Sequence, residues 1–288
     1  MRKIIALILV IVCFSNVLVS ANSYEPSIDI ETITDEPDIS AEYAILIDPD
    51  TNTILYEKES HTKASIASMT KLMTILVCME ACGNPKEEKI TVSSKVTELS
   101  PYSSRCGLRS GDVISCEDLF YGLMLPSGND AAVALAMHFG GSIDGFAVLM
   151  NQKAKELGMH NTNFCNPHGL DEDGHCSTAY DIAILAGEVI KNEDIISITS
   201  TVSHKMNAKR NGIDVSWNVR SINFMLSNSS AHYFEGVEGL KTGSTSNAGY
   251  CFSGYYSLKG RRMISVVIGS DSVYKRFEDT KKTFEVRS

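Results

Sequence analysis

The sequence predicts a mixed α/β fold in which helices pack on one mixed sheet. Three features of the chain predict it: a pair of strands near residue 50, a helix-rich middle, and a run of strands after residue 198. Strands at both ends of a chain, with helices between them, can form a single sheet that the helices cover. With 288 residues, the chain is long enough for one large domain or two small ones.

The first elements are expected to be a β-hairpin and a helix. Residues 43–48 and 53–57 are predicted strands, and the turn-forming sequence Pro-Asp-Thr-Asn separates them. An apolar run then begins at Met69 and stops at Gly83-Asn84-Pro85, as helices do. Ser68 therefore lies near the N-terminus of a predicted helix, where backbone N–H groups favour negative charge.

The middle of the chain is predicted to be helical and the end to be mostly strands. Further helices are expected at residues 117–123, 131–139, 143–157 and 178–190. Thr178 begins the last of these, and Asp181 at its third position completes a capping pattern. Strands are expected at residues 198–206, 239–242, 250–256 and 263–269, with a last helix within residues 271–284.

The N-terminal region is predicted to lie outside the fold. Residues 1–21 have the pattern of a secretory signal peptide: Arg2 and Lys3, an apolar run over residues 4–14, and a cleavage site at Val19-Ser20-Ala21. We therefore expect export to an extracytoplasmic location, in the cell wall or secreted. Residues 22–42 hold seven acidic residues and no Lys or Arg, which predicts an acidic linker.

Charge and cysteine usage exclude some classes of function. The formal net charge is −9, and losing residues 1–21 removes two bases and no acid, which gives −11. No basic stripe is present, so nucleic-acid binding is not expected. Seven cysteines remain after that loss, an odd number in a domain large enough to need no disulfides. Cys106 with Cys116, and Cys165 with Cys176, are the pairs that can form.

Three short polar motifs indicate the chemistry. They are Ser68-Met-Thr-Lys71, Ser127-Gly-Asn129 and Lys241-Thr-Gly243. Together they supply a hydroxyl nucleophile, amines that can carry its proton, and a strand edge. The order and types match the S-x-x-K, S-D-N and K-T-G set of acyl-serine enzymes, with Gly at the centre of the second motif.

The position of Ser68 separates it from other serines in a similar string. Ser60 and Ser272 also begin a Ser-x-x-Lys string, but Ser60 lies in a polar stretch and Ser272 near the charged C-terminus. Only Ser68 opens an apolar helix, and Lys71 follows one turn later on the same face. A serine hydroxyl is a poor nucleophile at neutral pH, so it needs an adjacent base such as a partly neutral lysine. Burial and a second cation such as Lys241 would favour that neutral form.

At these motifs the chain resembles the low-molecular-mass penicillin-binding proteins, specifically the D-alanyl-D-alanine carboxypeptidases of the S11 peptidase type. The likeness extends to residues 163–171, 174–181, 236–243, 248–251 and 262–269, and covers roughly residues 43–284. Ile66 stands where the family often has proline. The resemblance implies a β-lactamase/transpeptidase-like fold: an antiparallel sheet flanked by helices, plus a helical subdomain that carries Ser127-Gly128-Asn129.

The resemblance also implies the domain plan and the activity. Residues 43–288 are expected to be one serine DD-peptidase catalytic domain, without the second β-rich domain or the C-terminal membrane anchor of many relatives. The expected reaction removes the terminal D-alanine from peptidoglycan stem pentapeptides through an acyl-enzyme on Ser68. β-Lactam antibiotics are expected to acylate the same serine. No cofactor, metal or stable membrane anchor is expected.

The family's roles carry over to the matching residues of this chain. Lys71 is expected to be the base, and Ser127 to pass a proton to the leaving amine. Asn129 is expected to bind the substrate amide, and Gly243 to let the peptide lie along the strand edge. The oxyanion hole would be the backbone N–H groups of Ser68 and Ser244. The substrate's terminal carboxylate would be bound by Lys241, Thr242 and Arg262.

Other functions share these groups. A DD-endopeptidase differs in substrate fit and not in chemistry. A class A β-lactamase uses a glutamate for deacylation, and no Glu-x-x-Leu-Asn lies between Ser127 and Lys241. The closest string, at residues 188–192, falls in a predicted helix. A non-catalytic wall-binding or penicillin-sensing module ranks last, because all key groups are present.

A cluster of polar residues in one loop allows a metal site to be considered. His168, Asp171, Asp173 and His175 lie within eight residues of one another. Their spacing matches none of the zinc signatures, and the chain has no C-x-x-C motif. We therefore expect these side chains to form hydrogen bonds within their loop.

Overall fold

The computed structural model describes residues 36–286, which belong to one compact unit. The strands are β1 (Tyr43–Asp48), β2 (Thr53–Lys58), β3 (Lys89–Thr91), β4 (Val113–Ser115), β5 (Ser203–Arg210), β6 (Ile213–Arg220), β7 (Val237–Thr245), β8 (Gly249–Leu258) and β9 (Arg261–Ser270). The helices are α1 (Lys71–Ala81), α2 (Cys116–Met124), α3 (Asn129–Gly140), α4 (Ile143–Glu156), α5 (Ala179–Val189), α6 (Glu193–Thr199) and α7 (Lys275–Glu285). Short 3₁₀ segments span Ala67–Thr70 and Ser94–Glu98.

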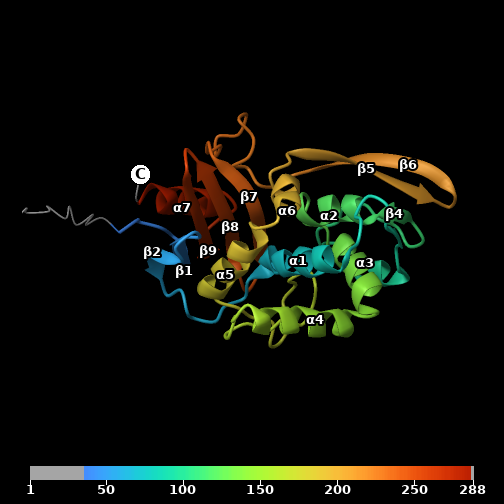
Figure 1. The fold of residues 1–288 in the computed structure, drawn as a ribbon, viewed down its shortest axis with the longest axis horizontal. Helices are drawn as coiled ribbons and strands as arrows, with labels where there is room; N and C mark the ends of the chain where they lie inside the picture. The colour runs from blue at the N-terminus through green and yellow to red at the C-terminus, as the bar shows by residue number, and fades with distance from the viewer. Residues whose placement is uncertain (1–35, 287–288) are drawn as a thin grey trace, which may run out of the picture. The chain divides into compact units, whose positions relative to one another are not determined.

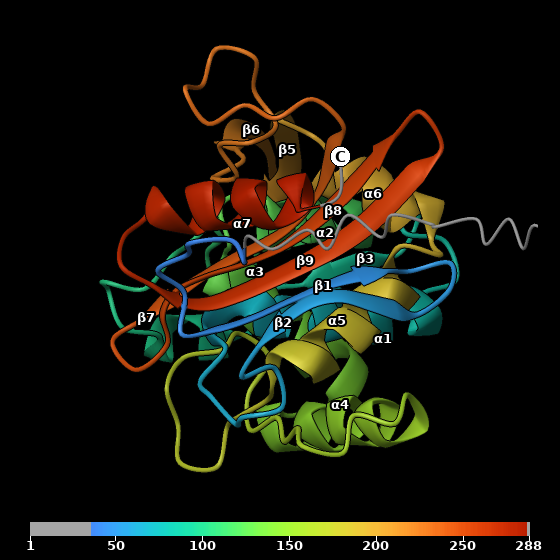
Figure 2. The same ribbon diagram turned by 90° about the vertical axis from the view of Figure 1, so that its left-hand side faces the viewer.

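The central layer is a five-stranded sheet with the order β2-β1-β9-β8-β7. All of its strand pairs are antiparallel. Helix α7 packs on one face of the sheet, and α1 and α5 lie on the other (Figure 2). Strand β7 is an edge strand, so one of its sides has no neighbouring strand in this sheet.

The alternation of side chains along β1 shows how the two faces are filled. Ile45 and Ile47 join the large core with α1 and α5, whereas Ala44 and Leu46 join a smaller core beneath α7. This period of two is what a strand buried on both faces requires, because successive side chains point to opposite sides. The smaller core includes Phe277 and Phe284 of α7.

A second, four-stranded antiparallel sheet has the order β3-β4-β5-β6. It lies beside the helical part formed by α2, α3 and α4, and β5 and β6 form a long hairpin (Figure 1). The prediction of a single mixed sheet was therefore wrong, since the chain forms two sheets and both are antiparallel. Three-residue strands such as β3 and β4 are too short to show a periodicity in the sequence.

Most predicted elements are confirmed, with one clear exception. The hairpin, the helices after Ser68 and the last three strands occur within a few residues of their predicted bounds. The predicted strand at residues 198–206 was wrong at its start, because α6 continues to Thr199 and β5 begins at Ser203. Asn192 caps α6 by accepting from the backbone N–H groups of Asp194 and Ile195. These contacts favour a helical turn over an extended chain.

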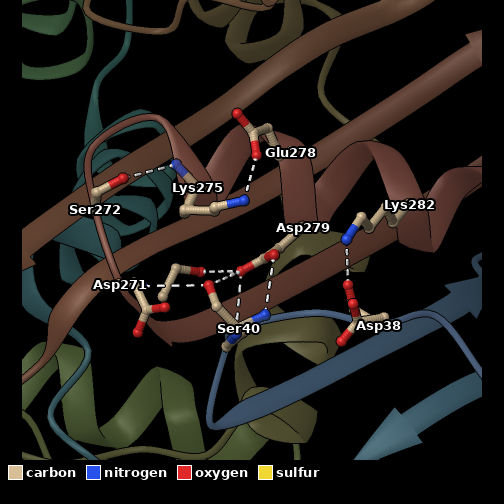
Figure 3. Close-up of polar contacts among 10 residues, drawn as sticks. Asp38, Ser40, Asp271, Ser272, Lys275, Glu278, Asp279 and Lys282 are labelled. Atoms are coloured by element: carbon tan, nitrogen blue, oxygen red, sulfur yellow. Dashed lines mark hydrogen bonds and ion pairs between the residues drawn. The ribbon is translucent and has the colours of Figure 1, made fainter.

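The end of the predicted linker belongs to the folded domain. Ile39 and Ala41 are buried, and the backbone N–H groups of Ser40 and Ala41 donate to the Asp279 carboxylate of α7 (Figure 3). The Ser40 and Ser270 hydroxyls also donate to Asp279. The fold therefore begins several residues before residue 43. The predicted signal peptide and most of the predicted linker lie outside the described residues.

Membrane-spanning segments were sought in residues 36–286. No single helix there is long and apolar enough to cross a membrane. Helices α3 and α4 meet the length and composition criterion only as a pair, and they are bent by 83° at their junction.

Candidate active site

Ser68 lies in the 3₁₀ turn Ala67–Thr70 that leads directly into α1. The Thr70 hydroxyl donates to Ala67 O at 2.8 Å and closes this turn. Gly169 of a neighbouring loop packs against it so closely that a Cβ atom there would lie 1.9 Å from Ala67 O. Only glycine fits at position 169, and the turn that carries Ser68 is thereby held against the loop of residues 163–175, named here the His168 loop.

Lys71 is fully buried one turn after Ser68 and is the centre of the site. Its Nζ donates to Ser68 Oγ at 2.8 Å, to Asn129 Oδ1 at 2.7 Å and to the backbone oxygen of His168 at 2.8 Å. An ammonium has three protons, and these three acceptors use all of them. In a neutral amine one contact must reverse, which lets the Ser68 hydroxyl donate to Nζ.

Burial lowers the pKa of Lys71 to about 7, and the nearby Asp130 carboxylate partly opposes this shift. Desolvation disfavours the charged form of a lysine, so a large fraction of Lys71 is neutral near pH 7. This confirms burial as a cause of the expected neutral form. Lys241 was also expected to lower the pKa of Lys71. The repulsion between the two cations instead lowers the pKa of Lys241.

Asp130 holds the motif Ser127-Gly128-Asn129 in place. Its buried carboxylate accepts from the backbone N–H groups of Cys106, Gly107 and Leu108 at 2.8–3.1 Å. The backbone N–H of Asn129 donates to Ser104 O at 2.8 Å. The start of α3 is therefore fixed to the segment of residues 104–108, and Asn129 is oriented with its Oδ1 on Lys71.

Ser127 lies in the turn between α2 and α3 with a positive φ of 61°. This is the left-handed region, which non-glycine residues adopt rarely and at an energetic cost. The Ser127 hydroxyl is buried and has no hydrogen-bond partner among the described residues. Ser127 is therefore a buried hydroxyl in a strained turn, two residues before Asn129, which contacts Lys71. Without a partner of its own among those residues, this hydroxyl can accept and donate a proton during a reaction.

Lys241 on β7 supplies a second buried cation. Its side chain is 1% exposed, and its Nζ donates to the backbone oxygen of Thr242 at 3.0 Å. Burial lowers its pKa well below the ordinary value, and the charges on Lys71 and Arg276 lower it further. Thr242 is buried beside it, and Ser244 is exposed two residues later.

Gly243 has a structural role in addition to the substrate role that was expected of it. A Cβ atom at this position would lie 3.0 Å from Ala67 Cβ and 3.1 Å from the backbone nitrogen of Ser68. The missing side chain therefore lets β7 pack against the turn that carries Ser68. This contact also places the backbone of β7 beside the Ser68 N–H group.

Arg262 does not join the site. It pairs with Ser257 at the far end of the sheet, whereas Lys241 pairs with Ser253. Its guanidinium donates to Tyr255 Oη at 2.9 Å and to Asp50 Oδ1 at 2.5 Å. The prediction that Arg262 neutralises a substrate carboxylate was therefore wrong, because those partners hold it about four residues along the strands from Lys241.

Arg276 of α7 takes the place that was expected of Arg262. Its guanidinium donates to Gly243 O at 3.1 Å, and the side chain is 5% exposed. Its charge is close enough to lower the pKa of Lys241. Nothing in the local sequence marks this residue, because a cation in an amphipathic C-terminal helix is ordinarily on the surface. Only the packing of α7 on the sheet brings it to β7.

The side chains of the His168 loop form hydrogen bonds within the loop, as expected, and also with residues outside it. His175 Nε2 contacts Thr70 Oγ1 at 2.8 Å, and its Nδ1 accepts from the Cys165 N–H at 3.0 Å. Burial lowers the pKa of His168 to about 3 and that of His175 to about 4, so both rings are neutral at pH 7. Within residues 36–286, no group of three or more His, Cys, Asp or Glu side chains is arranged to hold a metal ion.

The cysteines of the described chain are all free thiols. Neither Cys106 with Cys116 nor Cys165 with Cys176 forms a disulfide. Cys82 donates to a carboxylate oxygen of Glu88 at 3.0 Å. Burial, together with this contact, raises the pKa of Cys82 to about 11, so it stays a thiol at neutral pH.

The glutamate that would serve a class A β-lactamase is absent from the site. Glu188, in the string closest to the required motif, lies in α5 and pairs with Lys191 at the surface. The group that faces Lys71 from the His168 loop is a backbone carbonyl. A carbonyl oxygen accepts hydrogen bonds but cannot take a proton from water, so the loop group in contact with Lys71 is not a base for deacylation.

Comparison with known proteins identifies one peptidase family over most of the chain, in agreement with the groups of the site. The model of the S11 peptidase family, described as D-alanyl-D-alanine carboxypeptidase, matches residues 30–272. Among curated proteins, D-alanyl-D-alanine carboxypeptidase DacF of Bacillus subtilis is 38% identical over 249 residues, covering 85% of this chain and 61% of its own length. The carboxypeptidase DacD of Escherichia coli is 35% identical, covering 85% and 62%. The chain thus spans about three fifths of the length of these relatives.

Solved structures share the architecture as well as the sequence. The crystal structure of the Streptomyces K15 DD-transpeptidase superposes with a TM-score of 0.82 at 29% identity, covering 88% of this chain and 98% of that one. The D-alanyl-D-alanine carboxypeptidase DacD of Francisella tularensis gives a TM-score of 0.77 at 28% identity, covering 88% and 72%. The fold is therefore the one that penicillin-binding DD-peptidases share. By sequence, architecture and motif order, the chain belongs to the S11 peptidase family of D-alanyl-D-alanine carboxypeptidases.

Proposed function

We propose that this protein is a serine-type D-Ala-D-Ala carboxypeptidase that removes the terminal D-alanine from peptidoglycan stem peptides. The observation that carries the proposal is the contact between a fully buried lysine, with a pKa of about 7, and the hydroxyl of Ser68 at 2.8 Å. A serine becomes a nucleophile when an adjacent base takes its proton. Lys71 meets both requirements, since it is close and partly neutral.

Acylation uses the groups on both sides of Ser68. Neutral Lys71 takes the hydroxyl proton as Ser68 Oγ attacks the carbonyl carbon between the two D-alanines. The oxyanion accepts from the backbone N–H groups of Ser68 and Ser244. The C–N bond then breaks, and the proton on Lys71 reaches the amine of the leaving D-alanine through the Ser127 hydroxyl, which gives one proton and receives another, so Lys71 is neutral again. Losing one oxyanion donor typically lowers the rate about 10²–10³-fold.

Deacylation returns the enzyme to its starting state. A water molecule attacks the ester carbonyl, its proton goes to an amine of the site, and Ser68 leaves with a proton. Lys71 is the base closest to the ester oxygen, because it already contacts Ser68 Oγ. The group of the His168 loop that contacts Lys71 is a carbonyl and not a carboxylate, which argues for slow release of penicilloyl groups; for this reason we propose that β-lactams inhibit this enzyme.

The substrate's terminal carboxylate is bound at β7. Lys241 and Arg276 are two buried cations on either side of Thr242 and Gly243. A carboxylate that enters between them gains charge-assisted hydrogen bonds and offsets their mutual repulsion. This arrangement supports a preference for substrates that end in a free carboxylate, as a carboxypeptidase requires.

The test is release of D-alanine from Nα,Nε-diacetyl-Lys-D-Ala-D-Ala. The unaltered protein should release it, and Ser68→Ala should abolish the release. Ser60→Ala is the matched control, because Ser60 begins another Ser-x-x-Lys string and its hydroxyl donates to Glu57 and not to a group of the site. Equal release by the protein and by Ser68→Ala would contradict the proposal, as would failure of benzylpenicillin to label Ser68.

A second candidate activity uses the same acyl-enzyme. One solved relative is named a DD-transpeptidase, and its structure matches this chain over 98% of its own length. Transfer of the acyl group to an amine in place of water would make a new peptide bond. Adding glycine to the assay and measuring the acyl-glycine product against free acid separates transfer from hydrolysis.

We also infer that the protein is exported and acts outside the cytoplasm. The supporting observation is the signal-peptide pattern of residues 1–21. Expression of the full chain with a C-terminal tag, followed by N-terminal sequencing of the extracytoplasmic protein, tests it. Export requires a new N-terminus near residue 22, and an intact Met1 on cytoplasmic protein would contradict it.

A further inference from the structure

The direction of a bound substrate follows from the position of the groups that hold it. In the proposed reaction, the terminal carboxylate binds at Lys241 and Arg276, and the scissile carbonyl binds between the N–H groups of Ser68 and Ser244. The substrate therefore runs along the free edge of β7, and its remaining residues extend past Thr245 toward the turn before β8. Each residue advances the chain about 3.3 Å along a strand.

Asp171 lies at the end of β7 toward which that part of the substrate would extend. Its Oδ1 accepts from the Thr245 hydroxyl at 2.7 Å, and its Oδ2 accepts from the Asn247 N–H at 3.3 Å. Thr245 Oγ1 in turn accepts from the Ala248 N–H at 3.1 Å. The carboxylate and the turn between β7 and β8 thus form one hydrogen-bonded unit.

The other side of Asp171 is fixed as well. It follows Gly169, whose close packing on Ala67 O holds the His168 loop against the turn of Ser68. Asn166 Oδ1 accepts from the N–H groups of His168 and Gly169, which keeps the loop in one conformation. Asp171 therefore has a defined position relative to both Ser68 and β7, although its side chain is exposed.

The carboxylate of Asp171 can bind a cation, and no cationic side chain of the neighbouring described segments pairs with it. A carboxylate has about four lone-pair sites, and the protein uses two of them. The His168 loop and residues 245–249 contain no Lys or Arg, and both histidines of the loop are neutral at pH 7. Asp171 forms no ion pair with any residue in 36–286.

We propose that Asp171 determines specificity by pairing with a positively charged side chain on the residue that precedes D-Ala-D-Ala. This inference rests on the proposed function. The favoured acyl donors are peptides with a free side-chain amine at that position, such as those with an unmodified diamino acid. A peptide whose amine is acylated or already cross-linked has no charge to offer and binds less well.

The test compares two peptides that differ only in that charge: Nα-acetyl-Lys-D-Ala-D-Ala and its Nε-acetylated form. The ratio of their kcat/KM values isolates the effect of the amine and cancels any loss of activity common to both. An exposed ion pair contributes modestly, so the unaltered protein should favour the free amine about two- to fivefold. Added salt should lower the ratio, because it screens exposed charges.

Variants assign the preference to one carboxylate. Asp171→Asn keeps an oxygen that can accept from Thr245 but removes the charge, so the ratio should fall to about one. Asp171→Lys should reverse the preference. Asp173→Asn is the matched control, because it removes the same charge at a position two residues away. The Asp173 side chain has no contact to β7 among the described residues, so this variant should keep the original ratio.

The outcomes separate this inference from the proposed function. A ratio of one in the unaltered protein, or a ratio that Asp171→Asn leaves unchanged, overturns the role of Asp171 while the carboxypeptidase activity stands. No D-alanine release from either peptide by the unaltered protein overturns the proposed function, and the specificity role is overturned with it.

Discussion

Replacing Lys71 by arginine tests the mechanism most directly, because it keeps the charge and removes the base. At the ordinary lysine pKa of 10.5, about one molecule in 3,000 would be neutral at pH 7. With the pKa lowered to about 7 by burial, about half are neutral. Burial therefore increases the available base roughly a thousandfold. An arginine stays protonated in a protein and loses that gain.

We expect Lys71→Arg to lower the rate of acylation about 10³-fold, within the range of 10²–10⁴ that general base catalysis supplies. The assay is the rate of labelling by a fluorescent penicillin, with D-alanine release as a second measurement. The pH profile of the unaltered protein gives an independent check. Since a rising pH increases the neutral form of Lys71, kcat/KM should rise with pH and level off above about 7.

Two results would refute this reasoning. One is a Lys71→Arg variant that penicillin acylates within about tenfold of the original rate. The other is a pH profile with no inflection between about 6 and 8. The second measurement needs no variant, so the mechanism remains testable if arginine does not fit the buried position of Lys71.

Three further predictions follow from the packing around the site. Arg276→Ala should raise KM and lower kcat/KM about tenfold, which is the loss expected for a charged hydrogen bond of about 1.5 kcal/mol. Arg262→Ala, at the far end of the sheet, should leave both values unchanged. Equal effects of the two substitutions would contradict the assignment of the carboxylate-binding role to Arg276 in place of Arg262. Gly243→Ala should slow acylation and lower the free energy of unfolding by about 1–3 kcal/mol, because the added Cβ lies 3.0 Å from Ala67 Cβ. Penicillin labelling measures the rate of acylation, and urea unfolding measures the free energy. An unaltered rate of acylation would argue against close packing at Ser68. Asp279→Ala leaves the buried donors of Ala41 and Ser270 and the half-buried donors of Ser40 without their acceptor, and it should lower the free energy of unfolding by about 3 kcal/mol. Asp271→Ala, at an exposed position, should change that free energy by less than about 0.5 kcal/mol. Comparable losses in the two variants would show that the contacts of residues 40 and 41 contribute little.

Elements with a strong local pattern were predictable. The hairpin of β1 and β2 and the helices α3, α4 and α5 combine apolar periodicity with a turn or cap in the sequence. Thr178 accepts from the Asp181 N–H, as its spacing predicted. Elements without such signals were missed. Strands β3 and β4 have three residues each, and α6 has seven, too few to show a period clearly.

The site was predictable where neighbouring positions in one motif interact. Lys71 lies three residues after Ser68 on the same turn, so their contact follows from helical spacing. The contact of Lys71 with Asn129 spans 58 positions in the sequence, and it was not predicted, because no local pattern reports a contact between distant segments. Arg262 was placed wrongly because its position along β9 depends on the register of the sheet.

By itself, the sequence determined the chemical groups of this protein and the order in which they occur, because a nucleophile, its base and a capping pattern are local properties. The tertiary structure alone decided which distant groups meet. Packing of α7 on the sheet brings Arg276 to Gly243, and the His168 loop brings a carbonyl to Lys71 and Asp171 to β7. It also decided the pKa of Lys71, since burial is a property of the folded chain as a whole.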